Sequence, residues 1–84
     1  MEYKIKENNI KYEAGRYFVN SWGELYQIIY DRDRGYALLN VEKASIESDF
    51  QETIEFLLKY TTIGDMKPVT QIAAAEFLLL LSLK

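Results

Sequence analysis

Residues 23–41, GELYQIIYDRDRGYALLNV, decide the fold. Two runs rich in Tyr, Ile, Leu and Val, residues 25–30 and 36–41, flank a polar segment at residues 31–35. That segment ends in Gly35, which can adopt a positive φ. The pattern predicts two antiparallel strands joined by a charged turn, and we expect the other elements to pack against this hairpin.

The register of the hairpin decides which side chains are buried. If Tyr30 opposes Tyr36, both faces of the hairpin are largely apolar. If Asp31 opposes Tyr36 across a four-residue loop, one face gathers six side chains suited to burial, namely Tyr26, Ile28, Tyr30, Ala37, Leu39 and Val41. Since burial of one face selects the register, we predict the second arrangement. The opposite face then keeps apolar residues that need cover, namely Leu25, Ile29, Tyr36 and Leu38.

Further strands are expected before the hairpin. Residues 3–6 and 10–13 alternate apolar and charged side chains around an Asn-Asn pair that suits a tight turn. Residues 16–19 are a third strand candidate. The sequence therefore predicts a four- or five-stranded antiparallel β-meander over residues 3–42.

Two helices are expected after the sheet. Ser48 and Gln51 have the spacing of a capping box, and the apolar stripe of residues 50, 54, 57 and 58 predicts a helix over residues 49–60. Residues 69–83 are apolar nearly all round and predict a C-terminal helix, although the leucine run within them also fits a strand. We expect one α+β domain over residues 1–84, with the sheet packed on the first helix. The second helix either covers the other face or pairs with a second copy of the chain.

Composition argues against several classes of function. The chain has no histidine and no cysteine, which removes the commonest general base and any thiolate metal site. Residues 1–43 are neutral and residues 44–84 carry the whole net charge of −3, so the basic footprint that duplex DNA requires is missing. The longest apolar run, residues 72–83, is shorter than the ~20 residues of a membrane span. We expect a cytoplasmic protein that contacts neither duplex DNA nor a membrane.

No motif carries chemistry. The Asp-Arg-Asp-Arg-Gly sequence at residues 31–35 partly matches a calcium loop, but its ligand series stops after two carboxylates. The serines have no histidine to activate them. We therefore expect no catalytic residue, no metal and no cofactor.

The remaining function is recognition of another protein, for which a basic surface is the candidate. We expect a non-enzymatic interaction module of the kind that serves as a small acidic inhibitor or accessory protein in phages and mobile elements. Trp22, in a turn, either folds back over the sheet or stays exposed as an anchor for the partner. The candidate partner-binding residues are Trp22, Arg32, Arg34, Glu47, Asp49, Glu52 and Glu55.

Two alternatives stay open. The seven tyrosines could stack the bases of a single-stranded nucleic acid or a nucleotide. The C-terminal helix could instead assemble a structural homo-oligomer. The candidate interface residues for that assembly are Leu25, Ile29, Tyr36, Leu38, Phe77, Leu80 and Leu81.

Overall fold

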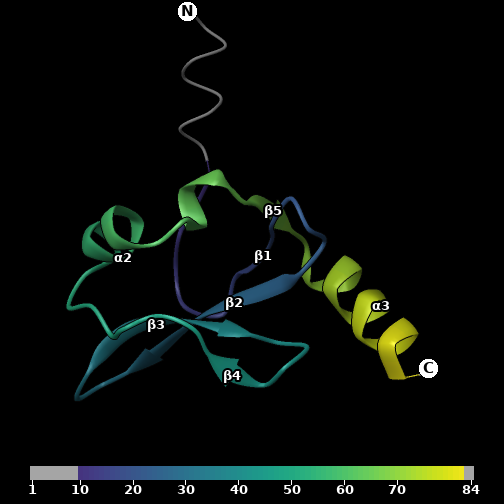
Figure 1. The fold of residues 1–84 in the computed structure, drawn as a ribbon, viewed down its shortest axis with the longest axis horizontal. Helices are drawn as coiled ribbons and strands as arrows, with labels where there is room; N and C mark the ends of the chain where they lie inside the picture. The colour runs from purple at the N-terminus through teal and green to yellow at the C-terminus, as the bar shows by residue number, and fades with distance from the viewer. Residues whose placement is uncertain (1–9, 83–84) are drawn as a thin grey trace, which may run out of the picture.

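The computed structural model describes residues 10–82, which form a five-stranded antiparallel sheet with short helices (Figure 1). The strands stand in the order β4-β3-β2-β1-β5. The elements are β1 (Tyr17–Val19), β2 (Leu25–Asp31), β3 (Gly35–Asn40), β4 (Ser45–Ile46), α2 (Ile54–Tyr60), the 3-10 helix η1 (Ile63–Asp65), β5 (Lys67–Val69) and α3 (Gln71–Ser82). The predicted α+β class and the antiparallel sheet are confirmed.

The sheet uses different strands from those expected. Residues 10–13 form no strand, and the rest of the predicted N-terminal hairpin, residues 3–9, lies outside the described residues. The outer strands β4 and β5 come instead from two segments that the sequence pattern assigned to connections. Strands of two and three residues are too short to show a period of two, so the pattern could not reveal them.

The predicted register of the central hairpin is wrong. Tyr30 opposes Tyr36 and Asp31 opposes Gly35, so the loop is one residue shorter than expected. The side chain of Asp31 explains this one-residue change of register, because its Oδ1 accepts from the backbone amides of Asp33 at 2.8 Å and Arg34 at 3.2 Å. Gly35 follows at a φ of +101°, as a three-residue hairpin loop with a bulge requires. The tilted rings of Tyr30 and Tyr36 then contact each other, with 4.8 Å between their centroids.

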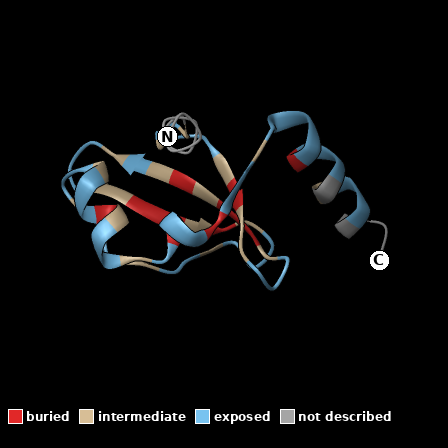
Figure 2. Cartoon of the chain, turned by 90° about the horizontal axis from the view of Figure 1, so that it is seen from above, coloured by how far each residue is buried: buried red, intermediate tan, exposed pale blue. Residues whose placement is uncertain are grey.

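The core lies between one face of the sheet and the α2–η1 segment (Figures 1 and 2). The sheet contributes Phe18, Tyr26, Ile28 and Leu38, while Leu57, Ile63 and Met66 come from the opposite layer. Leu38 therefore lies on the core face of the sheet, where the sequence predicted Ala37. Ala37 is buried on the opposite face. Of the apolar stripe that predicted the first helix, Ile54, Leu57 and Leu58 face the core, whereas Phe50 precedes the helix and lies against Arg34.

Helix α2 begins later than predicted. Its N-cap is Thr53, whose side-chain oxygen accepts from the Phe56 amide at 3.2 Å. Ser48 is not a cap, because its Oγ accepts from the Leu38 amide at 2.9 Å and so belongs to the sheet edge. Residues 49–53 are held outside the helix by Gln51, whose backbone pairs with Tyr36.

Helix α3 extends away from the sheet in both ribbon views (Figures 1 and 2). It starts at Gln71, because Val69 belongs to strand β5. Ala74 is buried in this helix. Ile72 and Leu80 are largely exposed. The expectation that this helix covers the second face of the sheet is therefore not met in the single chain.

Pro68 occupies the outer edge of the sheet at β5. The Arg16 carbonyl accepts from the Ile28 amide, so the backbone N–H and C=O of Phe18, two residues further along β1, also point toward β2. Pro68 is the antiparallel partner of Phe18, so its backbone nitrogen points away from β1, toward the open edge. A proline there has no N–H to offer an incoming strand.

We predict that Gly35→Ala lowers the free energy of unfolding by roughly 2–4 kcal/mol. The new Cβ would overlap the carbonyl of Gln51, and the φ of +101° is already unfavourable for alanine. Urea denaturation followed by circular dichroism measures the effect.

Gly64→Ala is the matched control, because nothing lies within 4 Å of its added Cβ and its φ is not positive. We expect a change within about 1 kcal/mol for that variant. Equal destabilisation by the two substitutions would contradict the close approach of residues 35 and 51.

Candidate functional site

The edge of the sheet beyond β4 carries a wide bulge. Glu47 donates its amide to the Leu38 carbonyl at 2.8 Å, and Tyr36 and Gln51 exchange two backbone hydrogen bonds of 2.7 Å. Residues 48–50 therefore lie opposite Ala37 alone. The Ser48 hydroxyl oxygen accepts from the Leu38 amide, where a regular strand would offer a backbone carbonyl. Bulges of this kind turn side chains out of the sheet, and they are frequent beside functional sites.

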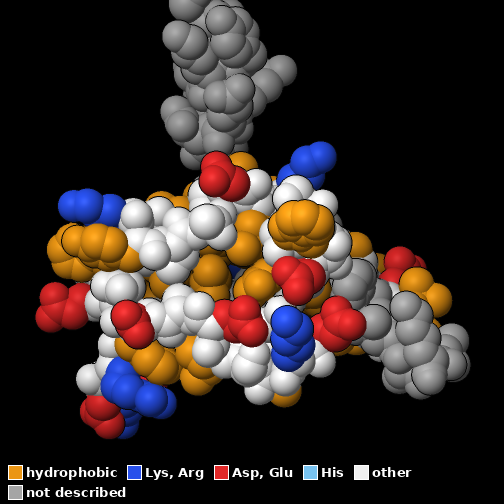
Figure 3. Space-filling model, in the orientation of Figure 1, with side chains coloured by type: hydrophobic (Ala, Val, Ile, Leu, Met, Phe, Trp, Pro, Cys, Tyr) orange, Lys and Arg blue, Asp and Glu red, His pale blue; other side chains and the backbone are white. Residues whose placement is uncertain are grey.

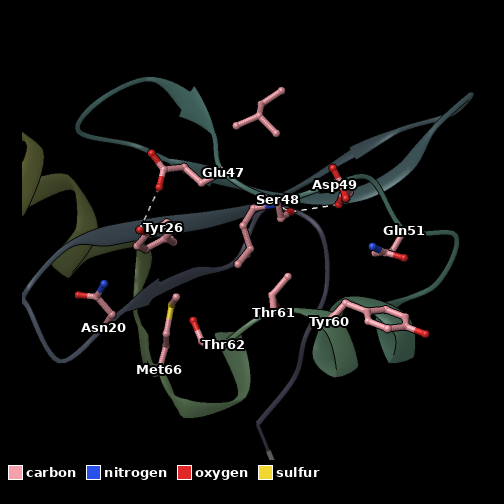
Figure 4. Close-up of a pocket in the computed structure, with 12 residues that line it drawn as sticks. Asn20, Tyr26, Glu47, Ser48, Asp49, Gln51, Tyr60, Thr61, Thr62 and Met66 are labelled. Atoms are coloured by element: carbon pink, nitrogen blue, oxygen red, sulfur yellow. Dashed lines mark hydrogen bonds between the residues drawn. The ribbon is translucent and has the colours of Figure 1, made fainter.

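An open groove of about 900 Å³ lies between this bulge and residues 60–66 (Figure 4). In the close-up, Glu47, Ser48 and Asp49 stand on one side of the groove, and Thr61 and Thr62 stand on the other. The residues that line the groove, which we call the acidic groove, are Asn20, Tyr26, Leu38, Ile46, Glu47, Ser48, Asp49, Gln51, Tyr60, Thr61, Thr62 and Met66.

The charged side chains that line the groove are acidic. Glu47 and Asp49 are exposed, and none of the described lining residues is Lys or Arg. Glu47 accepts from the Ser45 hydroxyl at 2.8 Å, which holds its carboxylate without neutralising it. On the face shown in Figure 3, acidic side chains, with a basic one among them, lie around a hollow that has hydrophobic side chains in it. The arrangement favours a cationic ligand.

Tyr26 lies under the acidic wall with its hydroxyl 3.5 Å from Glu47 Oε1 (Figure 4). Burial raises the pKa of this phenol, and the Glu24 and Glu47 carboxylates raise it further. A hydrogen bond with Asn40 and the charge of Lys43 oppose the rise in this pKa. The hydroxyl therefore keeps its proton and remains a donor beneath the groove.

One end of the groove is formed by the β1–β2 turn. Asn20 Oδ1 accepts from the amides of Trp22 at 3.0 Å and Glu24 at 2.9 Å, and its Nδ2 donates to Glu24 Oε1 at 2.8 Å. Gly23 supplies the positive φ of 81° that the turn needs. Trp22 is 86% exposed, so the interpretation in which it folds back over the sheet is wrong.

The other predicted partner-binding residues lie outside the groove. Glu52 and Glu55 are exposed near the start of α2. Arg34 bonds Asp31 Oδ2 at 3.0 Å and lies 4.2 Å from the ring centroid of Phe50, so it braces the hairpin tip. Arg32 is exposed at that tip. Of the predicted residues, the structure thus brings Glu47 and Asp49 together.

The Asp31 carboxylate has a structural role at the tip. The Asp33 amide, followed by the Arg34 side chain, lowers the pKa of this carboxyl. The loop is therefore held by an ionised aspartate at neutral pH.

The predicted oligomer interface is not one surface. Leu25 is 1% exposed and Leu38 is 4% exposed, so both are buried within the chain. The observed register also places Tyr36 and Leu38 on the face toward α2, with Leu25 and Ile29 on the opposite one. Leu80 is exposed on α3, whereas the side chains of Phe77 and Leu81 lie outside the described part of the structure.

The tyrosines are divided between core and surface. Tyr12 stacks on Phe18 with 5.3 Å between ring centroids, Tyr26 is buried, and Tyr36 packs against the core. Tyr30 and Tyr60 are largely exposed but belong to different elements. Within residues 10–82, the sheet tyrosines therefore give little support to a platform for stacking bases.

Sequence reasoning missed most of the uncharged groove residues. The sequence pattern places Tyr60 at the end of the predicted helix and gives no functional role to Asn20, Thr61 or Thr62. These residues line a groove that depends on the pairing of Gln51 with Tyr36, and no local sequence pattern predicts that pairing.

Within the described residues, no group of three or more acidic side chains is placed to hold a metal ion. The helices described here are all too short or too polar to cross a membrane. Comparison of the chain with protein-family models, curated proteins and solved structures found no match.

We predict that alkaline conditions destabilise the protein through Tyr26. The raised pKa means that the folded state disfavours the phenolate more than the unfolded chain does. Its contribution to stability is complete below the ordinary value of 10.0 and is lost as the pH rises through the higher folded value. Urea denaturation at a series of alkaline pH values measures this loss.

Tyr26→Phe is the control, since it removes the titrating group and keeps the ring. The fall in stability above pH 10 should be smaller in this variant than in the wild type. An identical fall in both proteins would assign the alkaline sensitivity to other groups.

Proposed function

We propose that the protein is a non-enzymatic protein-binding module whose acidic groove takes a Lys- or Arg-bearing segment of a partner. The observation that carries this proposal is the pair of exposed carboxylates, Glu47 and Asp49, on one wall of a groove with no described basic lining residue. An inhibitor or accessory role follows if the bound segment belongs to the partner's working surface. We place this binding in the cytoplasm, as we expected from the sequence.

The groove suits a long basic side chain in shape as well as charge. Its opposite wall carries the hydroxyls of Thr61 and Thr62, which can accept hydrogen bonds from an ammonium or guanidinium group. Ile46 lines the groove with an exposed side chain, against which the aliphatic stem of Lys or Arg can pack. A cationic side chain would therefore find acceptors on both walls and an apolar surface beside them.

The proposal predicts that charge reversal in the groove abolishes binding of basic peptides. The probe is an isotope-edited NMR titration with a peptide of alternating lysine and glycine at low salt. We expect the wild type to show shifts at residues 47–51 and 60–62. The double variant Glu47→Lys/Asp49→Lys should bind at least about tenfold more weakly, because two attractive exposed pairs become repulsive.

The control is Glu52→Lys/Glu55→Lys, which changes the net charge equally but lies outside the groove. It should keep most of the affinity once salt screens the long-range charge. Equal losses in the two double variants would contradict a specific groove. No binding of the peptide to the wild type at low salt would refute the proposed function itself.

A further inference from the structure

We infer that Trp22 and the acidic groove form one docking surface for an extended partner segment. That segment carries a Lys or Arg and, two to four residues away, a large apolar side chain. The inference rests on the proposed function and specifies the partner more closely. The basic residue enters the groove, and the apolar residue packs on the indole.

The backbone of Trp22 is already held by the hydrogen bonds of its turn. Both the Trp22 and Glu24 amides donate to Asn20 Oδ1, and Gly23 closes the turn with a backbone hydrogen bond of 3.0 Å to Asn20. A tryptophan held on an ordered turn loses little backbone entropy when a partner covers it. Exposed tryptophans in such positions are the residues most enriched at binding hot spots.

Asn20 joins the indole to the groove. Its side chain lines the groove, and its Oδ1 is 3.0 Å from the Trp22 amide nitrogen. The indole therefore lies within roughly 10 Å of the groove wall, and an extended chain advances about 3.3 Å per residue. This geometry sets the spacing of two to four residues between the basic and the apolar side chain.

Glu47 is the acidic lining residue at this end of the groove. In Figure 4, Asn20 and Glu47 lie at the same end, whereas Gln51 and Tyr60 lie at the other. Glu24 is also close to Asn20, but Lys43 Nζ is 3.9 Å from its carboxylate and partly neutralises it. Glu47 is thus the acceptor that we assign to the partner's basic residue.

Two peptides test the inference directly. The first is acetyl-Gly-Gly-Lys-Gly-Gly-Gly-Gly-Gly-amide, and the second replaces the third glycine after the lysine with leucine. Trp22 is the single tryptophan of the chain, so its fluorescence reports contact with the leucine. We expect the leucine peptide to bind at least about tenfold more tightly and to shift the emission to shorter wavelengths.

Variants separate this inference from the proposed function. Measured by NMR titration, because Trp22→Ala has no tryptophan fluorescence, this variant should bind both peptides alike, with the affinity of the wild type for the lysine-only peptide. Ile72→Ala, which removes a comparably exposed apolar side chain from α3, should keep the preference for leucine. If the wild type binds both peptides equally, or if Trp22→Ala retains the preference for the leucine peptide, the inference is wrong. The proposed function of the acidic groove is not contradicted by that result. If the wild type binds neither peptide, the inference and the proposed function both fail.

Discussion

The structure depends on a close backbone approach between Gly35 and Gln51. Tyr36 and Gln51 exchange two hydrogen bonds of 2.7 Å there, and the position of Gly35 leaves no room for a side chain. This contact fixes one end of the segment that follows β4, while Glu47 fixes the other end on Leu38. The three residues between them are turned out of the sheet. The same contact sets where the chain leaves the sheet edge, so that α2 can bring Leu57 onto the core.

The sequence predicted those parts of the fold that depend on local patterns. The apolar runs around residues 31–35 specified the hairpin, and the spacing of Ile54, Leu57 and Leu58 specified a core-facing helix. The register was missed because it depends on hydrogen bonds from the Asp31 side chain to its own loop. The helix start was missed because the sheet edge engages Ser48, the predicted cap, and Thr53 caps the helix in its place.

The candidate site was likewise predictable only where it depends on local sequence. Charge density in the second half of the chain pointed to Glu47 and Asp49, and both line the groove. The groove itself could not be predicted, because it forms only when Gln51 pairs with a residue fifteen positions earlier. Its opposite wall comes from Thr61 and Thr62, which belong to the end of α2 and the start of η1. Binding surfaces built from such long-range pairings leave no contiguous motif.

Pro68 at the outer edge of β5 limits how copies of this chain can assemble. The described sheet has two borders, and Pro68 withholds an N–H at one of them. Backbone pairing between copies is then favoured only along β4, where the same border of each molecule would meet in a two-fold arrangement. Such pairing closes on itself after two molecules. If copies of this chain associate edge to edge, the position of one imino acid therefore favours a finite pair over an open-ended fibre.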